Sequence, residues 1–152
     1  MPIGKKTMTA TEYVVDVLGG ASVFKGRTVP TSTELRERIK RGLPYRSLES
    51  VRERLRLSVP EAATVLHMPA RTLARRRQAR RLDRDESDRL YRIARVAAQA
   101  FAVFGGEDKA AAWLGRPNRA LNGEVPIHLL DTDVGARQVE DILGRIEHGG
   151  VS

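Results

Sequence analysis

Apolar residues recur along the chain at the three- and four-residue spacing of amphipathic helices. In the range 47–57, Leu48, Val51 and Leu55 fall on one face of a predicted helix. The range 83–104 carries the longest pattern, an apolar stripe formed by Leu90, Ile93, Ala94, Ala97, Phe101 and Phe104. No stretch is convincing as a strand. We therefore expect an all-α fold.

Start and stop signals divide this pattern into short helices. Capping boxes, in which a polar residue is followed three positions later by Glu, are predicted to begin at Thr31, Ser58 and Asp83. Pro69 ends one helix, because the residue before a proline is disfavoured in helical conformation. Further helices are predicted over 11–18 and 107–114. A last helix, capped by Asp131 or Thr132, has as its apolar positions Val134, Val139, Ile142, Leu143 and Ile146.

The charge is large and unevenly distributed. The 152 residues are 41% hydrophobic, which suits a folded protein, and they carry a formal net charge of +8. Residues 1–106 hold 22 Lys+Arg and 11 Asp+Glu, whereas residues 107–152 hold 5 and 8, so the two parts carry +11 and −3. The excess predicts an acidic partner, with nucleic acid first and an anionic membrane surface second. The asymmetry suggests two different tasks for the two parts.

Six arginines and no acid lie in the range 71–81. Two short helices over 60–67 and 70–80, joined by a tight turn, match the outline of a helix-turn-helix whose second helix enters the major groove of DNA. Arg71, Arg75 and Gln78 share one face, and Arg and Gln pair bidentately with base edges. The arginines beside this face are placed to contact phosphates, and Leu73 is expected to anchor the helix to the core. The candidate DNA-binding residues are Arg71, Thr72, Arg75, Arg76, Gln78 and Arg80.

A solvated helix face without a ligand is the alternative interpretation of this arginine run. DNA binding is favoured because the arginines of the predicted helix over 70–80 have no acidic partner four residues away. The acidic residues after Leu82 then cap the next helix and keep phosphate away from it.

Nothing in the sequence points to catalysis, to a metal or to another cofactor. His67, His128 and His148 are isolated and lack metal-ligand spacing, and the chain has no cysteine. No stretch approaches the roughly 18 apolar residues of a membrane span, and the N-terminus lacks a signal-peptide pattern. We expect a soluble, cytoplasmic protein that is not an enzyme and does not contact a membrane.

Two segments resemble the Xre/MbcA/ParS family of antitoxins. AAWLGRPNRALNGEVPIHLLDTDVGARQVEDILGRIEHG is similar to the family's toxin-binding domain, and RTLARRRQARRLDRDESDRLYRIARV is similar to its helix-turn-helix part. The resemblance covers nearly everything after Leu43. It implies an antitoxin that neutralises a RES-domain toxin, which consumes NAD, and that represses its own operon as a dimer. We expect a helix-turn-helix module packed with a small C-terminal toxin-binding domain.

The resemblance also suggests a division of the chain and a toxin-binding site. We predict an N-terminal extension over 1–43, a DNA-binding and dimerisation module over 44–106, and a toxin-binding domain over 107–152. Most apolar residues of the third region are interpreted as core. The polar or flexible positions left for a toxin are Arg116, Asn118, Arg119, Arg145, His148, Gly149, Gly150, Val151 and Ser152.

The chain end after the last helix is predicted to enter the active site of the toxin. The acids of the last helix, Glu140, Asp141 and Glu147, suit a pocket that binds pyrophosphate. A frayed terminus with no role is the alternative.

Two interpretations of the middle region are also kept. The candidate dimer interface lies on the long helix, through Tyr91, Val96, Ala100 or Val103. The rival to an antitoxin is a stand-alone transcriptional repressor whose C-terminal domain only dimerises.

Overall fold

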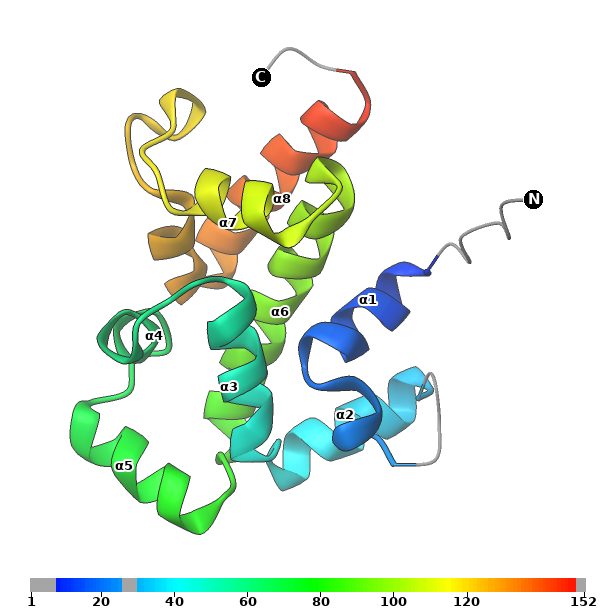
Figure 1. Cartoon of the computed structure of the whole chain (residues 1–152), viewed down its shortest axis with the longest axis vertical. Helices are drawn as coiled ribbons and strands as arrows, with labels where there is room; N and C mark the ends of the chain where they lie inside the picture. Colours follow the sequence, from blue (N-terminus) through cyan, green and yellow to red (C-terminus); the bar gives the residue numbers. More distant parts are fainter. Residues whose placement is uncertain (1–7, 26–29, 150–152) are drawn as a thin grey trace.

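The computed structural model describes residues 8–25 and 30–149 and is helical throughout these ranges (Figure 1), which confirms the all-α prediction. Within this described part, no helix has the length and apolar character that crossing a membrane requires. The elements are α1 Ala10–Val17, η1 Gly20–Ser22, α2 Ser32–Arg41, α3 Tyr45–Arg54, α4 Val59–Val65, α5 Ala70–Ala79, α6 Arg84–Phe104, α7 Glu107–Leu114, η2 Arg119–Leu121, η3 Pro126–Asp131 and α8 Asp133–Glu147, where η marks a 3-10 helix.

Helix α6 is the central element on which the others pack. α1, α2, α3, α7 and α8 all contact it, so elements from both ends of the chain share one helix (Figure 1). The buried apolar residues of these elements form one continuous cluster. The N-terminal helices therefore belong to the same core as the rest of the described chain, and the domain boundaries stay a prediction.

The capping signals operate as the sequence predicts. The hydroxyls of Thr31 and Ser58 each accept a hydrogen bond from the backbone N–H three residues later, and Glu at that position accepts one in return. Asp83 and Glu86 form the same reciprocal pair at the start of α6. Of the two candidates for α8, Thr132 is the cap, because its hydroxyl accepts from the N–H of Gly135 at 3.0 Å.

Three positions differ from the sequence-based expectation. Val134 was expected to be buried, but it is 71% exposed, because it lies in the first turn of α8 on the side away from the core. Val96 and Ala100 were candidates for a dimer interface, but both are 0% exposed within one chain. Core packing covers these two side chains, so they are not available to a second copy.

Helix α8 begins in close contact with the backbone of η3. Gly135 is buried in its first turn, and a Cβ atom there would overlap the carbonyl oxygen of Leu129. A backbone atom cannot move aside as a side chain can. Glycine is therefore required at this position because there is no space for a side chain, although glycine is otherwise unfavourable within a helix.

We predict that Gly135→Ala lowers the free energy of unfolding by about 1–3 kcal/mol, the usual cost of inserting a methyl group into a packed site. Gly144→Ala on the same helix is the matched control, because a Cβ there meets no atom within 4 Å. The control should stabilise by about 0.5–1 kcal/mol, the ordinary gain of alanine over glycine in a helix. Urea unfolding of the three proteins measures both values, and equal stabilities of the two variants would contradict the contact.

Candidate nucleic-acid interface and C-terminal surface

Helices α4 and α5 form the predicted pair of short helices joined by a turn. The turn passes through His67, whose φ of 54° is left-handed, and through Pro69, which stands just before α5. Met68 in this turn is 3% exposed and Leu73 of α5 is 5% exposed. These two apolar side chains anchor α5 to the core, as predicted for Leu73.

The outer face of α5 carries most of the predicted DNA-binding residues. Arg71, Arg75, Gln78 and Arg80 are exposed, whereas Thr72 is half-buried. Arg71, Arg75 and Gln78 repeat at four and three residues, so they lie on one side of the helix, and Leu73 points to the other side. Figure 1 shows α5 projecting at one end of the molecule. The arrangement places basic side chains along the exposed face of one helix, and an α-helix is an element that the major groove of DNA admits.

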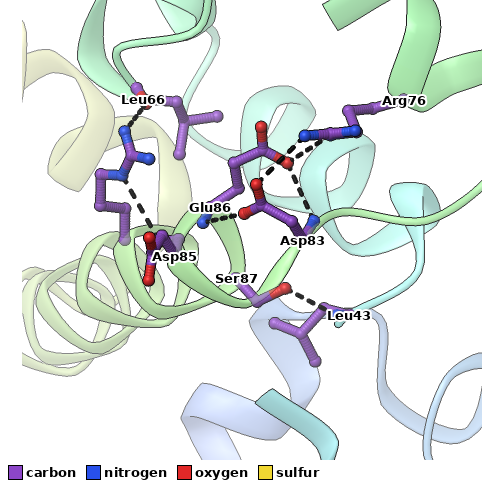
Figure 2. A network of polar contacts seen from close by, with 8 residues as sticks. Leu43, Leu66, Arg76, Asp83, Asp85, Glu86 and Ser87 are labelled. Atoms are coloured by element: carbon purple, nitrogen blue, oxygen red, sulfur yellow. Dashed lines mark hydrogen bonds and ion pairs between the residues drawn. The ribbon is translucent and has the colours of Figure 1, made fainter. Parts of the chain in front are cut away.

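Arg76 differs from the other arginines of α5, because its guanidinium is turned inward. Its Nε donates to Oε1 of Glu86 at 2.7 Å, and its Nη2 donates to Oδ2 of Asp83 at 3.1 Å (Figure 2). The side chain of Arg76 is 22% exposed. Arg76 has no acid four residues away, as expected, but its charge is nevertheless paired, because that spacing examines only one helix and these two partners come from the start of the next.

The first turns of α6 hold several other segments in place. Arg89 donates to the carbonyl oxygen of Leu66 at the end of α4, at 2.9 Å, and the hydroxyl of Ser87 accepts from the N–H of Leu43 at 2.7 Å (Figure 2). After α5, the backbone of Leu82 donates to the carbonyl oxygen of Leu43 at 2.9 Å. The sequence did not identify these contacts. The sequence singled out the first turn of α6 only by its capping box, and that pattern predicts contacts within the helix and none with other segments.

Hydrogen bonding to carboxylates raises the pKa of three described arginines, of which Arg52, bound to Glu49 within α3, is the first. The hydrogen bond to Glu86 raises the pKa of Arg76 above its ordinary value. The hydrogen bond to Glu140 likewise raises the pKa of Arg95, against the effect of burial. Both side chains are therefore permanently charged cations with a fixed partner.

The C-terminal region presents a separate polar surface. A loop between α7 and η3 is closed by a backbone pair, in which the N–H of Asn118 donates to the carbonyl oxygen of Glu124 at 3.0 Å. The side chain of Asn118 accepts from the N–H of Ala120 at 2.9 Å, so it shapes the loop. Arg116 and Arg119 are exposed on the same loop.

Most apolar residues of this region are core, as interpreted from the sequence. Leu114, Leu121, Ile127 and Leu130 are buried. Trp113 is half-buried, and its ring lies 5.5 Å from that of Phe104, centroid to centroid.

The end of α8 carries the remaining predicted residues. Arg145, His148 and Gly149 are exposed. The end of α8 and the loop lie at the end of the molecule opposite α5 (Figure 1). Gly150, Val151 and Ser152 fall outside the described residues.

Glu140 is not available to a partner as the sequence suggested. Both of its carboxylate oxygens accept from Arg95 of α6, at 2.8 and 3.2 Å. Asp141 and Glu147 are exposed. Of the three acids expected to face a partner, these two therefore remain exposed, and Glu140 joins α8 to α6.

Polar contacts between charged or hydrogen-bonding side chains connect the helix-turn-helix and the segment before it to the C-terminal region. His67 of the turn lies 3.4 Å from Asp131 at the end of η3, measured from Nε2 to Oδ2. Arg56 pairs with Asp108, and Arg54 lies 3.4 Å from Glu107. Among the described residues, no group of three or more His, Cys, Asp or Glu is placed to hold a metal ion.

Comparisons with known proteins match both regions. Residues 34–95 match the model of the antitoxin Xre-like helix-turn-helix domain, and residues 99–149 match that of the antitoxin Xre/MbcA/ParS C-terminal toxin-binding domain. Antitoxin Xre of Yersinia enterocolitica is 36% identical over 128 residues, covering 82% of this chain and 85% of that protein. Antitoxin Xre of Pseudomonas putida is 38% identical over 117 residues, covering 76% and 72%. Antitoxin Xre of Photorhabdus laumondii is 35% identical over 116 residues, covering 75% and 78%.

Proposed function

The chain belongs to the Xre family of antitoxins, and we propose that it neutralises a RES-domain toxin that consumes NAD and represses its own operon. The observation that carries the proposal is the placement of the two matched regions. The helix-turn-helix presents the basic exposed face of α5 at one end of the molecule, and the toxin-binding domain presents a loop and a helix end at the other (Figure 1). A single chain can then contact DNA and a toxin on separate surfaces.

The proposed DNA surface is the exposed face of α5. Arg71, Arg75 and Gln78 are assigned to base edges, because arginine and glutamine match guanine and adenine in the major groove. Thr72 and Arg80 are assigned to the phosphates beside the groove. Arg77 is exposed on the same helix and adds to the positive field.

We predict that Arg75→Ala weakens binding to the promoter fragment upstream of the chain's own gene by about 1–3 kcal/mol and relaxes its sequence preference. Arg80→Ala should instead weaken binding to all sequences and reduce the slope of log affinity against log salt by about 1. Titrations at several salt concentrations distinguish the two effects.

Lys109→Ala is the control for these titrations, because it removes one exposed positive charge from α7, away from α5. Its affinity for the promoter fragment should equal that of the wild type. If Arg75→Ala behaves like Lys109→Ala, α5 is not the reading helix.

The proposed toxin surface has two parts with different roles. The loop with Arg116, Asn118 and Arg119 supplies a firm contact, because its backbone is closed by hydrogen bonds and its arginines are exposed. The end of α8, with Arg145, His148 and the residues from 149 onward, is proposed to enter the NAD site of the toxin. Small residues at a chain end suit a narrow cleft, and Asp141 and Glu147 suit a positively charged pocket.

We predict that deletion of residues 147–152 separates binding from inhibition. The complex with the toxin should persist, because the loop surface remains, while NAD consumption resumes in the mixture. Co-purification and an NAD assay on the same sample measure both. The double change Arg116→Ala and Arg119→Ala should instead weaken the complex itself. Full inhibition by the truncated protein would show that the chain end has no part in blocking the site.

A homodimer is part of the proposal, because one short reading helix recognises too few base pairs for an operator. Of the four interface candidates, Tyr91 and Val103 are partly exposed and remain, whereas Val96 and Ala100 are buried. Light scattering of the free chain at micromolar concentration should give twice the mass of 16.9 kDa. A single-chain mass over that range would refute the dimer.

A further inference from the structure

The reading helix has few attachments to the rest of the protein. Among the ten residues of α5, all of them described, Leu73 alone is buried. Pro69 stands at its N-cap and provides no side-chain hydrogen bond. The flanks of α5 hold its two ends, because Met68 is buried just before the helix and the carbonyl oxygen of Arg80 at its C-cap accepts from the N–H of Tyr45 at 3.0 Å. Between these ends Leu73 is the one buried side chain, so a second side-chain attachment point is needed to fix the rotation of α5 about its own axis.

Arg76 provides that second point. It lies three residues after Leu73, so both side chains are on the inner side of the helix, opposite Arg71, Arg75 and Gln78. Its Nε and Nη2 donate to two different carboxylates, those of Glu86 and Asp83, at 2.7 and 3.1 Å (Figure 2). A planar guanidinium bound at two points has a fixed orientation.

The receiving group is itself rigid. Glu86 is 4% exposed, and its Oε1 also accepts from the N–H of Asp83 at 2.9 Å, within the capping box of α6. A buried carboxylate without a cationic partner is strongly unfavourable. Arg76 therefore supplies the cation that a buried Glu86 needs. If α5 rotated and removed Arg76, the carboxylate would become exposed or would stay buried without a cationic partner.

We propose that Glu86 is a positioning residue for DNA recognition: through Arg76 it fixes the rotation of α5, and so the direction in which Arg71, Arg75 and Gln78 point. The proposal rests on the proposed function of α5 as the reading helix. It removes Arg76 from the direct DNA contacts expected from the sequence and gives this arginine a role inside the protein.

The two roles of Arg76 predict opposite effects of a change at Glu86. If Arg76 binds phosphate directly, Glu86 competes with the phosphate for this arginine. Removing the charge of Glu86 then releases Arg76 and strengthens binding to all DNA. If Glu86 positions α5, the same change weakens binding to the specific sequence and leaves binding to random sequence unchanged or stronger. The ratio of the two affinities therefore distinguishes positioning from contact.

Glu86→Gln is the sharpest variant, because glutamine has nearly the same shape and also serves in a capping box. It removes the negative charge of the acceptor, so the bond from Arg76 loses the attraction between two opposite charges and keeps only the charge of its donor. We expect the full-length variant to bind the promoter fragment upstream of its own gene about tenfold more weakly. Its affinity for a random-sequence duplex of the same length should not fall.

Asp85→Asn is the matched control. Asp85 is an exposed acid in the same turn of α6, and Arg89 contacts only its backbone carbonyl oxygen. This control removes the same charge without touching Arg76, so its affinity for both duplexes should equal or slightly exceed that of the wild type.

Arg76→Lys provides a second, independent variant that remains informative if Glu86→Gln fails to fold. Lysine keeps the positive charge, and it binds phosphate well, but it lacks the two-point fork. Positioning predicts the same selective loss of promoter binding as in Glu86→Gln, and little further loss when the two changes are combined, since both break one contact. Thermal melting and retained complex formation with the toxin confirm that the variants are folded.

The outcomes separate the inference from the function on which it rests. A selective loss of promoter affinity in Glu86→Gln or Arg76→Lys, with Asp85→Asn unchanged, supports positioning. Promoter affinity equal to or above wild type in both folded variants, while Arg75→Ala still loses it, overturns the inference alone. Failure of Arg75→Ala to alter promoter binding overturns the proposed reading helix instead.

Discussion

Helix α6 buries ten of its 21 residues, and two of these, Glu86 and Ser87, are polar. A covered polar group is unfavourable unless it has hydrogen-bond partners, and a covered carboxylate needs a cation as well. Arg76 satisfies Glu86, and the N–H of Leu43 donates to the hydroxyl of Ser87 (Figure 2). The start of α6 is therefore compatible with one arrangement of its neighbours: α5 on one side and the segment before α3 on the other.

This constraint extends from α5 to the other end of the molecule, because α6 also carries the attachment of α8. Arg95 of α6 binds Glu140 of α8 with two hydrogen bonds, and Gln99 donates to the backbone carbonyl of the same residue at 3.2 Å. The small side chains of Ala94, Ala97 and Ala100, all 0% exposed, allow neighbouring helices to approach closely. One well-packed helix thus sets the geometry of both candidate surfaces.

Features with a local cause are those that the sequence predicted well. The caps at Thr31, Ser58 and Asp83 depend on residues three positions apart, so the pattern alone identifies them. The pairing of Arg76 with Glu86 has no such signal, because the two residues are ten positions apart and belong to different helices. The burial of Val96 likewise depends on which helices cover α6, which periodicity does not reveal. Local chemistry specifies the elements, and tertiary packing decides which of their charged and apolar groups remain on the surface.

The placement of charge is consistent with two partners bound at once. In the middle of the molecule, opposite charges are paired between regions, as in Arg56 with Asp108 and Arg54 with Glu107. The basic face of α5 and the loop and helix end of the C-terminal region lie at opposite ends (Figure 1). Helix α6, which connects the two ends, has 21 residues and spans about 30 Å. This is several times the screening length of about 8 Å at physiological salt. The acidic C-terminal region therefore weakens the attraction of α5 for phosphate very little. Under the proposed function, a toxin seated at one end leaves the reading face at the other end uncovered, so neutralisation and repression do not compete for the same surface.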